Sequence, residues 1–100
     1  MNSSPMTFKR KLANQDLRLT AHVCTIPSAI VTQAIASAGS DAVIIDMEHG
    51  AIDYSSAHAM IAATAGTSCA PLVRVTENDA AQVKRTLDLG AEGIVFPMIR

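Results

Sequence analysis

Four short, mainly apolar runs recur along the chain, and their regular spacing limits the fold more than any other feature. The runs cover residues 19–24, 42–46, 71–75 and 93–97, and their first residues lie roughly 22 to 30 positions apart. Each run has the length and the β-branched content of a buried strand. Such strands are typical of parallel sheets that crossover helices cover on both faces. The sequence therefore predicts an α/β fold with parallel strands.

Helical segments alternate with these runs and have recognisable ends. We expect helices over residues 29–38, 54–65 and 80–89, followed by Gly39, Gly66 and Gly90. A glycine directly after a helix accepts the left-handed backbone that often ends one. The third of these helices is expected to begin from a cap at Asn78 or Asp79 and to place Val83 and Leu87 on its inner face.

The spacing of the units fits both a (β/α)8 barrel and an open, doubly wound sheet. The glycine-rich motifs of the common nucleotide-binding open sheets, GxGxxG and GxxxxGK[ST], do not occur in the sequence. We therefore predict the first half of a TIM barrel, with about four βα units, in one incomplete domain over residues 1–100. Residues 1–18 form an N-terminal arm, with a short helix expected over residues 6–12.

A half-barrel has two open sheet edges, which are expected to invite association. Two copies could in principle complete one eight-stranded ring, and we expect a homo-oligomer. The net charge of −1 and the short basic run at residues 9–11 argue against binding to nucleic acid or to an acidic membrane surface.

No apolar run is long enough to span a bilayer, and the first residues do not resemble a signal peptide. Cys24 and Cys69 stand alone in apolar stretches, which predicts buried, reduced thiols and no zinc site or disulfide. We expect a cytoplasmic protein whose partner is a small molecule.

The candidate catalytic residues lie at, or just after, the ends of the second and third apolar runs. Asp46, Glu48 and His49 come at the end of the second run, and Arg74 comes at the end of the third. The carboxyl ends of parallel strands are where such folds place their working residues. A carboxylate beside an imidazole orients the ring for proton transfer, and a guanidinium can hold a developing oxyanion. We therefore predict His49 as a base, Asp46 or Glu48 as its partner and Arg74 as the substrate-binding group.

The same residues allow two other interpretations. Asp46 could cap the loop and form an interior ion pair with Arg74, which would leave His49 as an ordinary surface histidine. Alternatively, Asp46, Glu48 and His49 could ligate a metal ion, although adjacent loop residues rarely all face one ion. Of the other histidines, His22 is expected to be packed or to point into the barrel, and His58 to lie on a helix.

Five blocks of residues, in one order and spacing, match a single enzyme family. The blocks are residues 38–41, 45–50, 71–75, 78–79 and 87–94. Together they resemble the HpcH/HpaI aldolases, a family of metal-dependent pyruvate aldolases. The resemblance implies a carbon–carbon lyase that cleaves a 4-hydroxy-2-oxo acid, of the 2-keto-3-deoxy sugar acid class, to pyruvate and an aldehyde. Acyl-CoA-cleaving lyases share the barrel, but Glu48-His49-Gly50 favours the aldolases.

The resemblance also implies roles for individual residues. His49 corresponds to the family's general base, which acts through metal-bound water on the substrate hydroxyl, and Arg74 to the arginine that binds the pyruvate-derived oxygen. The acid in the Leu-Asp-x-Gly block, here Asp88, corresponds to the residue that makes the histidine more basic. The helix pattern instead places Asp88 far from the strand ends, so on geometry we pair His49 with Asp46.

In the family a glutamate and an aspartate from later strands hold a divalent ion, and a glutamine binds the substrate. The resemblance implies Mg, Mn or Co for the complete enzyme, with all of these ligands beyond Arg100. We expect no metal to be bound by this chain alone and the isolated chain to be inactive, since retro-aldol cleavage needs the Lewis acid. The alternative is a non-catalytic, truncated or oligomerising half-barrel.

Overall fold

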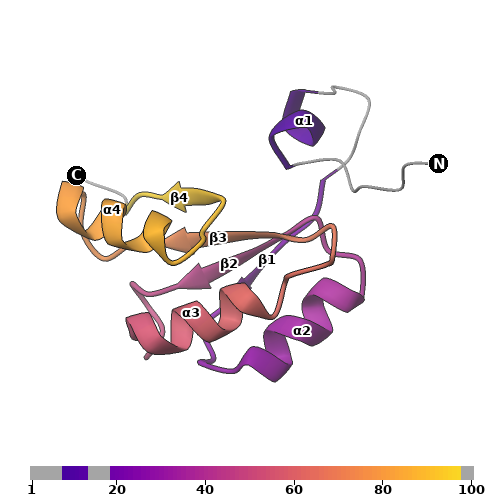
Figure 1. Cartoon of the computed structure of the whole chain (residues 1–100), viewed down its shortest axis with the longest axis horizontal. Helices are drawn as coiled ribbons and strands as arrows, with labels where there is room; N and C mark the ends of the chain where they lie inside the picture. The colour runs from indigo at the N-terminus through magenta and orange to yellow at the C-terminus, as the bar shows by residue number, and fades with distance from the viewer. Residues whose placement is uncertain (1–7, 14–18, 98–100) are drawn as a thin grey trace.

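The computed structural model describes residues 8–13 and 19–97 (Figure 1). Its elements, in chain order, are α1 (Phe8–Ala13), β1 (Ala21–Cys24), α2 (Ala29–Ser37), β2 (Ala42–Asp46), α3 (Tyr54–Ala62), β3 (Ala70–Arg74), α4 (Ala80–Asp88) and β4 (Gly93–Val95). The first two residues of the helix predicted over residues 6–12 lie outside the described residues. The predicted alternation of strands and helices is confirmed.

The four strands form one parallel sheet in the order β1-β2-β3-β4. Each strand therefore pairs with its neighbour in the sequence, and the order never reverses. An open, doubly wound sheet has a point at which the strand order reverses, whereas a barrel wall does not. The order supports the predicted half of a TIM barrel.

The helices cover one face of this sheet, where the sequence pattern predicted cover on both. Figure 1 shows α2 and α3 on the same side of the strands. The Arg85 guanidinium of α4 lies 4.2 Å from the centre of the Tyr54 ring at the start of α3, so α4 joins the same layer. Apolar runs alone do not show whether the second face meets helices or the interior of a barrel. A single helical layer is the arrangement of a barrel wall.

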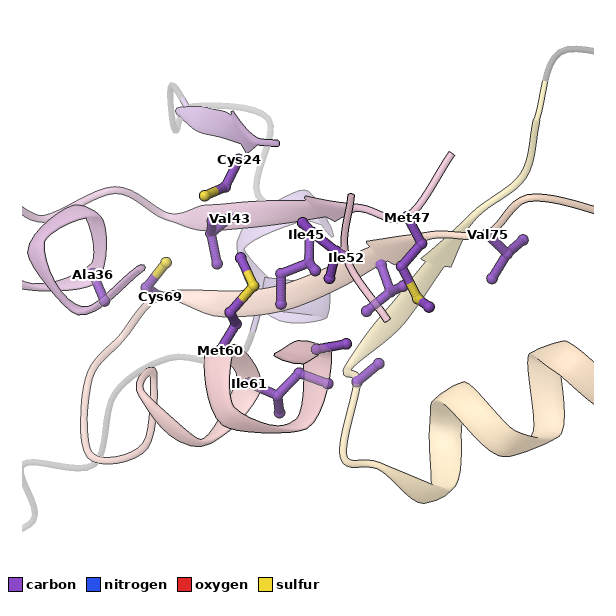
Figure 2. Packing of buried hydrophobic residues seen from close by; sticks show 13 residues of the cluster. Cys24, Ala36, Val43, Ile45, Met47, Ile52, Met60, Ile61, Cys69 and Val75 are labelled. Carbon is purple, nitrogen blue, oxygen red and sulfur yellow. The ribbon is translucent and has the colours of Figure 1, made fainter. Parts of the chain in front are cut away.

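Buried aliphatic side chains join the sheet to α3 (Figure 2). Val43 and Ile45 of β2 and Val73 of β3 are fully buried, as is Met60 of α3. Because successive strand residues point to opposite faces, Asp46 and Arg74 point away from this core, toward the interior side of the wall. The core thus packs against one face of both strands, while their last residues face the other way.

Both cysteines are buried and free, as predicted. Burial raises the pKa of the Cys69 thiol above its ordinary value. A buried thiol of this kind serves as apolar filling.

α2 and α4 each end one residue before the predicted positions 38 and 89, and two larger helix details differ from the predictions. α3 ends at Ala62, before the predicted residue 65, because the chain tightens into a turn in which the Thr64 hydroxyl donates to the Ile61 carbonyl at 2.7 Å. In α4, Leu87 is 46% exposed, and the buried inner position belongs to Thr86. Its hydroxyl donates to the Gln82 carbonyl within the helix, which satisfies the buried oxygen.

The ends of α4 follow the predicted pattern. Asp79 is the N-cap, with its side chain accepting from the Ala81 amide, and Gly90 has φ +108° directly after the C-cap. Among residues 8–13 and 19–97, no helix has the length and apolar character needed to cross a membrane.

α1 is tied to the sheet at the edge where the strands begin. The Lys11 ammonium donates to Asp41 Oδ1 at 2.9 Å and to the Ser68 carbonyl at 3.2 Å. Asp41 directly precedes β2, and Ser68 lies shortly before β3. One lysine therefore joins the N-terminal helix to two strand entrances.

Candidate active site

The predicted catalytic residues meet at the edge where β2 and β3 end. Asp46 and Arg74 are the last residues of these strands and are paired in register. The Met47 amide donates to the Arg74 carbonyl at 3.0 Å, which extends the pairing one residue past β2. The chain then turns back, with the Gly50 amide donating to the Asp46 carbonyl at 3.1 Å. This turn carries His49 back over the end of β2.

Asp46 is the centre of the cluster, and its side chain is 2% exposed. Its Oδ1 accepts hydrogen bonds from the amides of Glu48 at 2.9 Å and His49 at 3.0 Å. Its Oδ2 lies 3.1 Å from His49 Nδ1 and accepts from Arg74 Nη1 at 3.2 Å. Both carboxylate oxygens are therefore engaged.

The pKa of Asp46 lies below its ordinary value. Burial alone would raise it, but the His49 amide and ring, the Glu48 amide and the positive charge of Arg74 together outweigh burial. The carboxylate is thus ionised at neutral pH and can hold the His49 ring through a charge-assisted hydrogen bond.

His49 and Arg74 both reach solvent from this buried anchor. The His49 side chain is 62% exposed, that of Arg74 is 25% exposed, and Arg74 Nη1 lies 3.1 Å from His49 Nδ1. A single Nδ1 either donates a proton to Asp46 or accepts one from Arg74, so these two contacts are alternatives. When Nδ1 donates to Asp46, Nε2 carries a free lone pair and can accept a proton.

The structure contains features of both the catalytic interpretation and the ion-pair interpretation. Asp46 does cap the loop and does pair with Arg74, as an ordinary ion-pair network would require. It also contacts the ring of His49, which a surface histidine unrelated to the cluster would not show. The short distances bring His49, Asp46 and Arg74 together in the way that the catalytic prediction requires.

Asp88 lies apart from this cluster. It is the exposed last residue of α4, and the chain enters β4 only at Gly93, so Asp88 lies toward the edge where the strands begin. His49 follows the opposite end of β2. Within this chain the structure pairs His49 with Asp46.

The other two histidines lie away from the cluster. His58 lies on α3, as predicted, and is exposed. His22 is exposed, which contradicts the prediction that it is packed or directed into the barrel. Its Nδ1 lies 2.7 Å from the hydroxyl of Ser40, which in turn donates to the Ala42 carbonyl. His22 is paired with Val43 in register, so it points to the helical side of the sheet.

Asp46, Glu48 and His49 offer three ligand atoms within 4.8 Å of one another. The carboxylate of Asp46 is nevertheless fully engaged by amides, the His49 ring and the guanidinium of Arg74. A cation bound there would have to displace these donors and lie close to a positive charge. These three residues therefore do not fit a metal site of their own.

A model of the HpcH/HpaI aldolase/citrate lyase family matches residues 24–100 of the chain. The chain is 37% identical over 92 residues to a hydroxypyruvate/pyruvate aldolase of Paraburkholderia phytofirmans, covering 92% of this chain and 34% of that protein. It is 33% identical over 95 residues to a 5-keto-4-deoxy-D-glucarate aldolase of Salmonella paratyphi A, covering 95% of this chain and 37% of that protein.

The fold is similarly matched by the crystal structure of an HpcH/HpaI aldolase/citrate lyase family protein from Burkholderia cenocepacia. The TM-score is 0.84 at 34% identity, and the match covers 91% of this chain and 36% of that one. The chain thus spans about a third of the length of the relatives it matches.

Proposed function

The chain belongs to the HpcH/HpaI aldolase/citrate lyase family, and we propose that it supplies the base and the oxyanion-binding arginine of an aldolase site. The proposed reaction is retro-aldol cleavage of a 4-hydroxy-2-oxo acid to pyruvate and an aldehyde. The observation that carries the proposal is the contact of His49 and Arg74 with the same buried carboxylate, Asp46, at the strand ends.

In this reaction His49 takes the first proton. With Nδ1 donating to Asp46, Nε2 accepts the proton that leaves the substrate C4 hydroxyl. The C3–C4 bond then breaks, the C4 oxygen becomes the aldehyde carbonyl, and the bonding pair moves into the enolate of pyruvate. His49 then returns this proton to C3 of the enolate, which gives pyruvate and leaves the imidazole neutral again. Asp46 stabilises the positive charge that His49 carries between these steps.

Arg74 is placed to bind the oxygen on which the enolate charge develops. Its Nη1 contacts Asp46, and a guanidinium has further N–H donors in the same plane that can reach a substrate. Because the guanidinium is held by Asp46 before substrate binds, little reorganisation is needed when the oxyanion forms.

We further propose that the site works with a divalent ion, Mg, Mn or Co, held by residues other than those described. When bound, such an ion would polarise the substrate carbonyl as a Lewis acid. The engagement of Asp46 supports ligands from elsewhere, and we propose that they lie in sequence corresponding to the remaining two thirds of the relatives.

The proposed substrate is of the 2-keto-3-deoxy sugar acid class. The relatives named for hydroxypyruvate/pyruvate and for 5-keto-4-deoxy-D-glucarate support an oxo-acid substrate. The order Glu48-His49-Gly50 favours the aldolase side of the family over its citrate lyase side. We also propose a cytoplasmic homo-oligomer, since open strand edges at β1 and β4 favour association.

The test measures pyruvate release from a 2-keto-3-deoxy sugar acid with added Mg, Mn or Co. The chain is assayed alone and also joined, at the end of β4, to the remaining part of the Salmonella relative. We expect background release by the chain alone and metal-dependent release by the joined protein. His49→Ala and a chelator should each abolish it. Cleavage that survives both changes would contradict the proposed mechanism.

A further inference from the structure

The turn that carries His49 lies directly on the backbone of the preceding loop. A Cβ atom placed on Gly50 would lie 2.6 Å from the Thr25 carbonyl oxygen, 3.0 Å from Thr25 Cα and 2.8 Å from the Asp46 carbonyl oxygen. Thr25 directly follows β1, and Gly50 closes the turn after β2. The two loops thus approach too closely for any side chain at position 50.

Gly50 differs in this respect from the other glycines. Gly39 and Gly66 have positive φ and open space around the position of a Cβ atom, so they serve backbone conformation alone. At Gly93 the nearest obstacle is the flexible end of the Leu72 side chain, 3.0 Å away. At Gly50 the obstacles are backbone atoms of two elements, which cannot rotate away.

A displacement of Gly50 would reach the candidate active site through very few bonds. The Gly50 amide donates to the carbonyl of Asp46, and the neighbouring His49 amide donates to the Asp46 carboxylate. The His49 ring is itself 62% exposed, and the charged groups near its Nδ1 are Asp46, Arg74 and, at 3.7 Å, the Glu48 carboxylate. The position of the turn therefore determines whether the ring meets the carboxylate.

We infer that Gly50 is a positioning residue: its close approach to the backbone of Thr25 holds the turn that keeps the His49 ring on Asp46. The geometric part of this inference is independent of the proposed function. Only the statement that the positioned His49 ring acts as the base of an aldolase rests on it. The loop after β1 contributes no side chain to the Asp46 cluster, yet the backbone of Thr25 in that loop fixes the position of the turn that carries His49.

The experiment follows the Asp46 carboxyl carbon by NMR during a pH titration of the ¹³C-labelled chain. In Gly50→Ala the turn must move away from Thr25, the hydrogen bonds from His49 are lost, and the pKa of Asp46 rises toward that of an ordinary aspartate. Gly66→Ala is the matched control. It strains a glycine of positive φ at the turn after α3 and should lower stability while leaving the Asp46 titration unchanged.

A second variant tests the direction of the effect. Thr25→Gly gives the loop after β1 the freedom to move away from Gly50. Gly50→Ala combined with Thr25→Gly should therefore bring the pKa of Asp46 part of the way back down toward its value in the unaltered chain.

If Gly50→Ala does not fold, the unaltered chain decides the question. A nuclear Overhauser effect between the α protons of Gly50 and Thr25 supports the inference, and its absence overturns it.

An unchanged Asp46 titration in folded Gly50→Ala would also overturn the inference. These measurements use no substrate and no metal, so they are independent of the aldolase assay. An inactive joined protein with the expected titrations would refute only the proposed function.

Discussion

Two aspartates at opposite ends of β2 each accept hydrogen bonds from a backbone amide and a basic side chain, but their partners differ. Asp41, where β2 begins, accepts from Lys11 at 2.9 Å and from the Thr20 amide at 3.0 Å. Asp46, where β2 ends, accepts from two amides and lies beside a guanidinium and an imidazole. The pKa of Asp41 is lowered mainly by the Thr20 amide and then by Lys11, and that of Asp46 is also lowered.

The difference lies in what the partners can still do. Lys11 is 11% exposed and also donates to the Ser68 carbonyl, so its charge is committed to joining α1 to the sheet. At Asp46, His49 keeps a free ring nitrogen in solvent and Arg74 keeps unused donors. An ionised carboxylate therefore builds a structural joint where β2 begins and holds solvent-accessible groups where β2 ends, depending on how far its partners extend into solvent.

The largest expected effect comes from exchanging the cation at each aspartate. Arg74→Lys in the joined protein should lower the rate of pyruvate release about 100-fold to 1,000-fold, because an ammonium that stays on Asp46 cannot also present a planar donor to the enolate oxygen. Lys11→Arg should leave the rate within about twofold, since Lys11 contacts structural partners only. The measurement is kcat with saturating metal. Equal losses in the two variants would show that the two edges do not differ in function.

Removing each carboxylate compares the two clusters as sources of stability. Asp46→Ala should lower the free energy of unfolding by about 3 kcal/mol, because two amides and a partly buried guanidinium lose their acceptor. Asp41→Ala should cost about 1 to 2 kcal/mol, since its side chain is 22% exposed and water can replace part of the contact. Urea unfolding measures both values. A larger loss for Asp41→Ala would reverse our ranking of the clusters.

Much of the Asp46 cluster could be predicted because it depends on short-range pattern. β2 was predicted over its observed bounds, since a β-branched run is flanked by polar residues on both sides. Asp46 and His49 lie three residues apart in a tight loop, which brings an imidazole back to the carboxylate. Arg74 ends the next strand, and parallel register places it beside Asp46.

Other features depend on contacts that the local pattern does not show. Leu87 and Thr86 are neighbours, and whether one or the other faces the core depends on the rotation of α4 against the sheet. His22 faces the helical side, as does Val43, its partner in register, and the mainly apolar run over residues 19–24 did not reveal this. The close approach of Gly50 to Thr25 joins loops that are distant in sequence, so Gly50 appeared only as one letter of a motif.

A smaller effect is expected from removing the lysine that joins α1 to the sheet. Lys11→Met should lower stability by about 1 kcal/mol, because the methionine keeps the apolar part of the side chain while Asp41 loses a charged donor. Amide hydrogen exchange should accelerate mainly in α1 and at Thr20, with the protection of the His49 amide unchanged. Faster exchange at His49 would mean that the two ends of β2 are coupled, and would contradict the independence of the Asp41 and Asp46 clusters.

The smallest effect is the pH dependence that each aspartate contributes. Both folded pKa values lie below the ordinary value of 3.8, so each carboxylate adds stability above that pH and loses its contribution as the pH falls through its folded pKa. The free energy of unfolding should therefore decrease as the pH is lowered from about 5 to about 2. Asp46→Asn should remove part of this slope and Asp41→Asn another part, with urea unfolding at each pH as the measurement. The two parts should add, because the clusters lie at opposite ends of β2 and share no partner. A double variant that loses clearly less slope than the sum of the two would show that protonation at one edge is transmitted to the other.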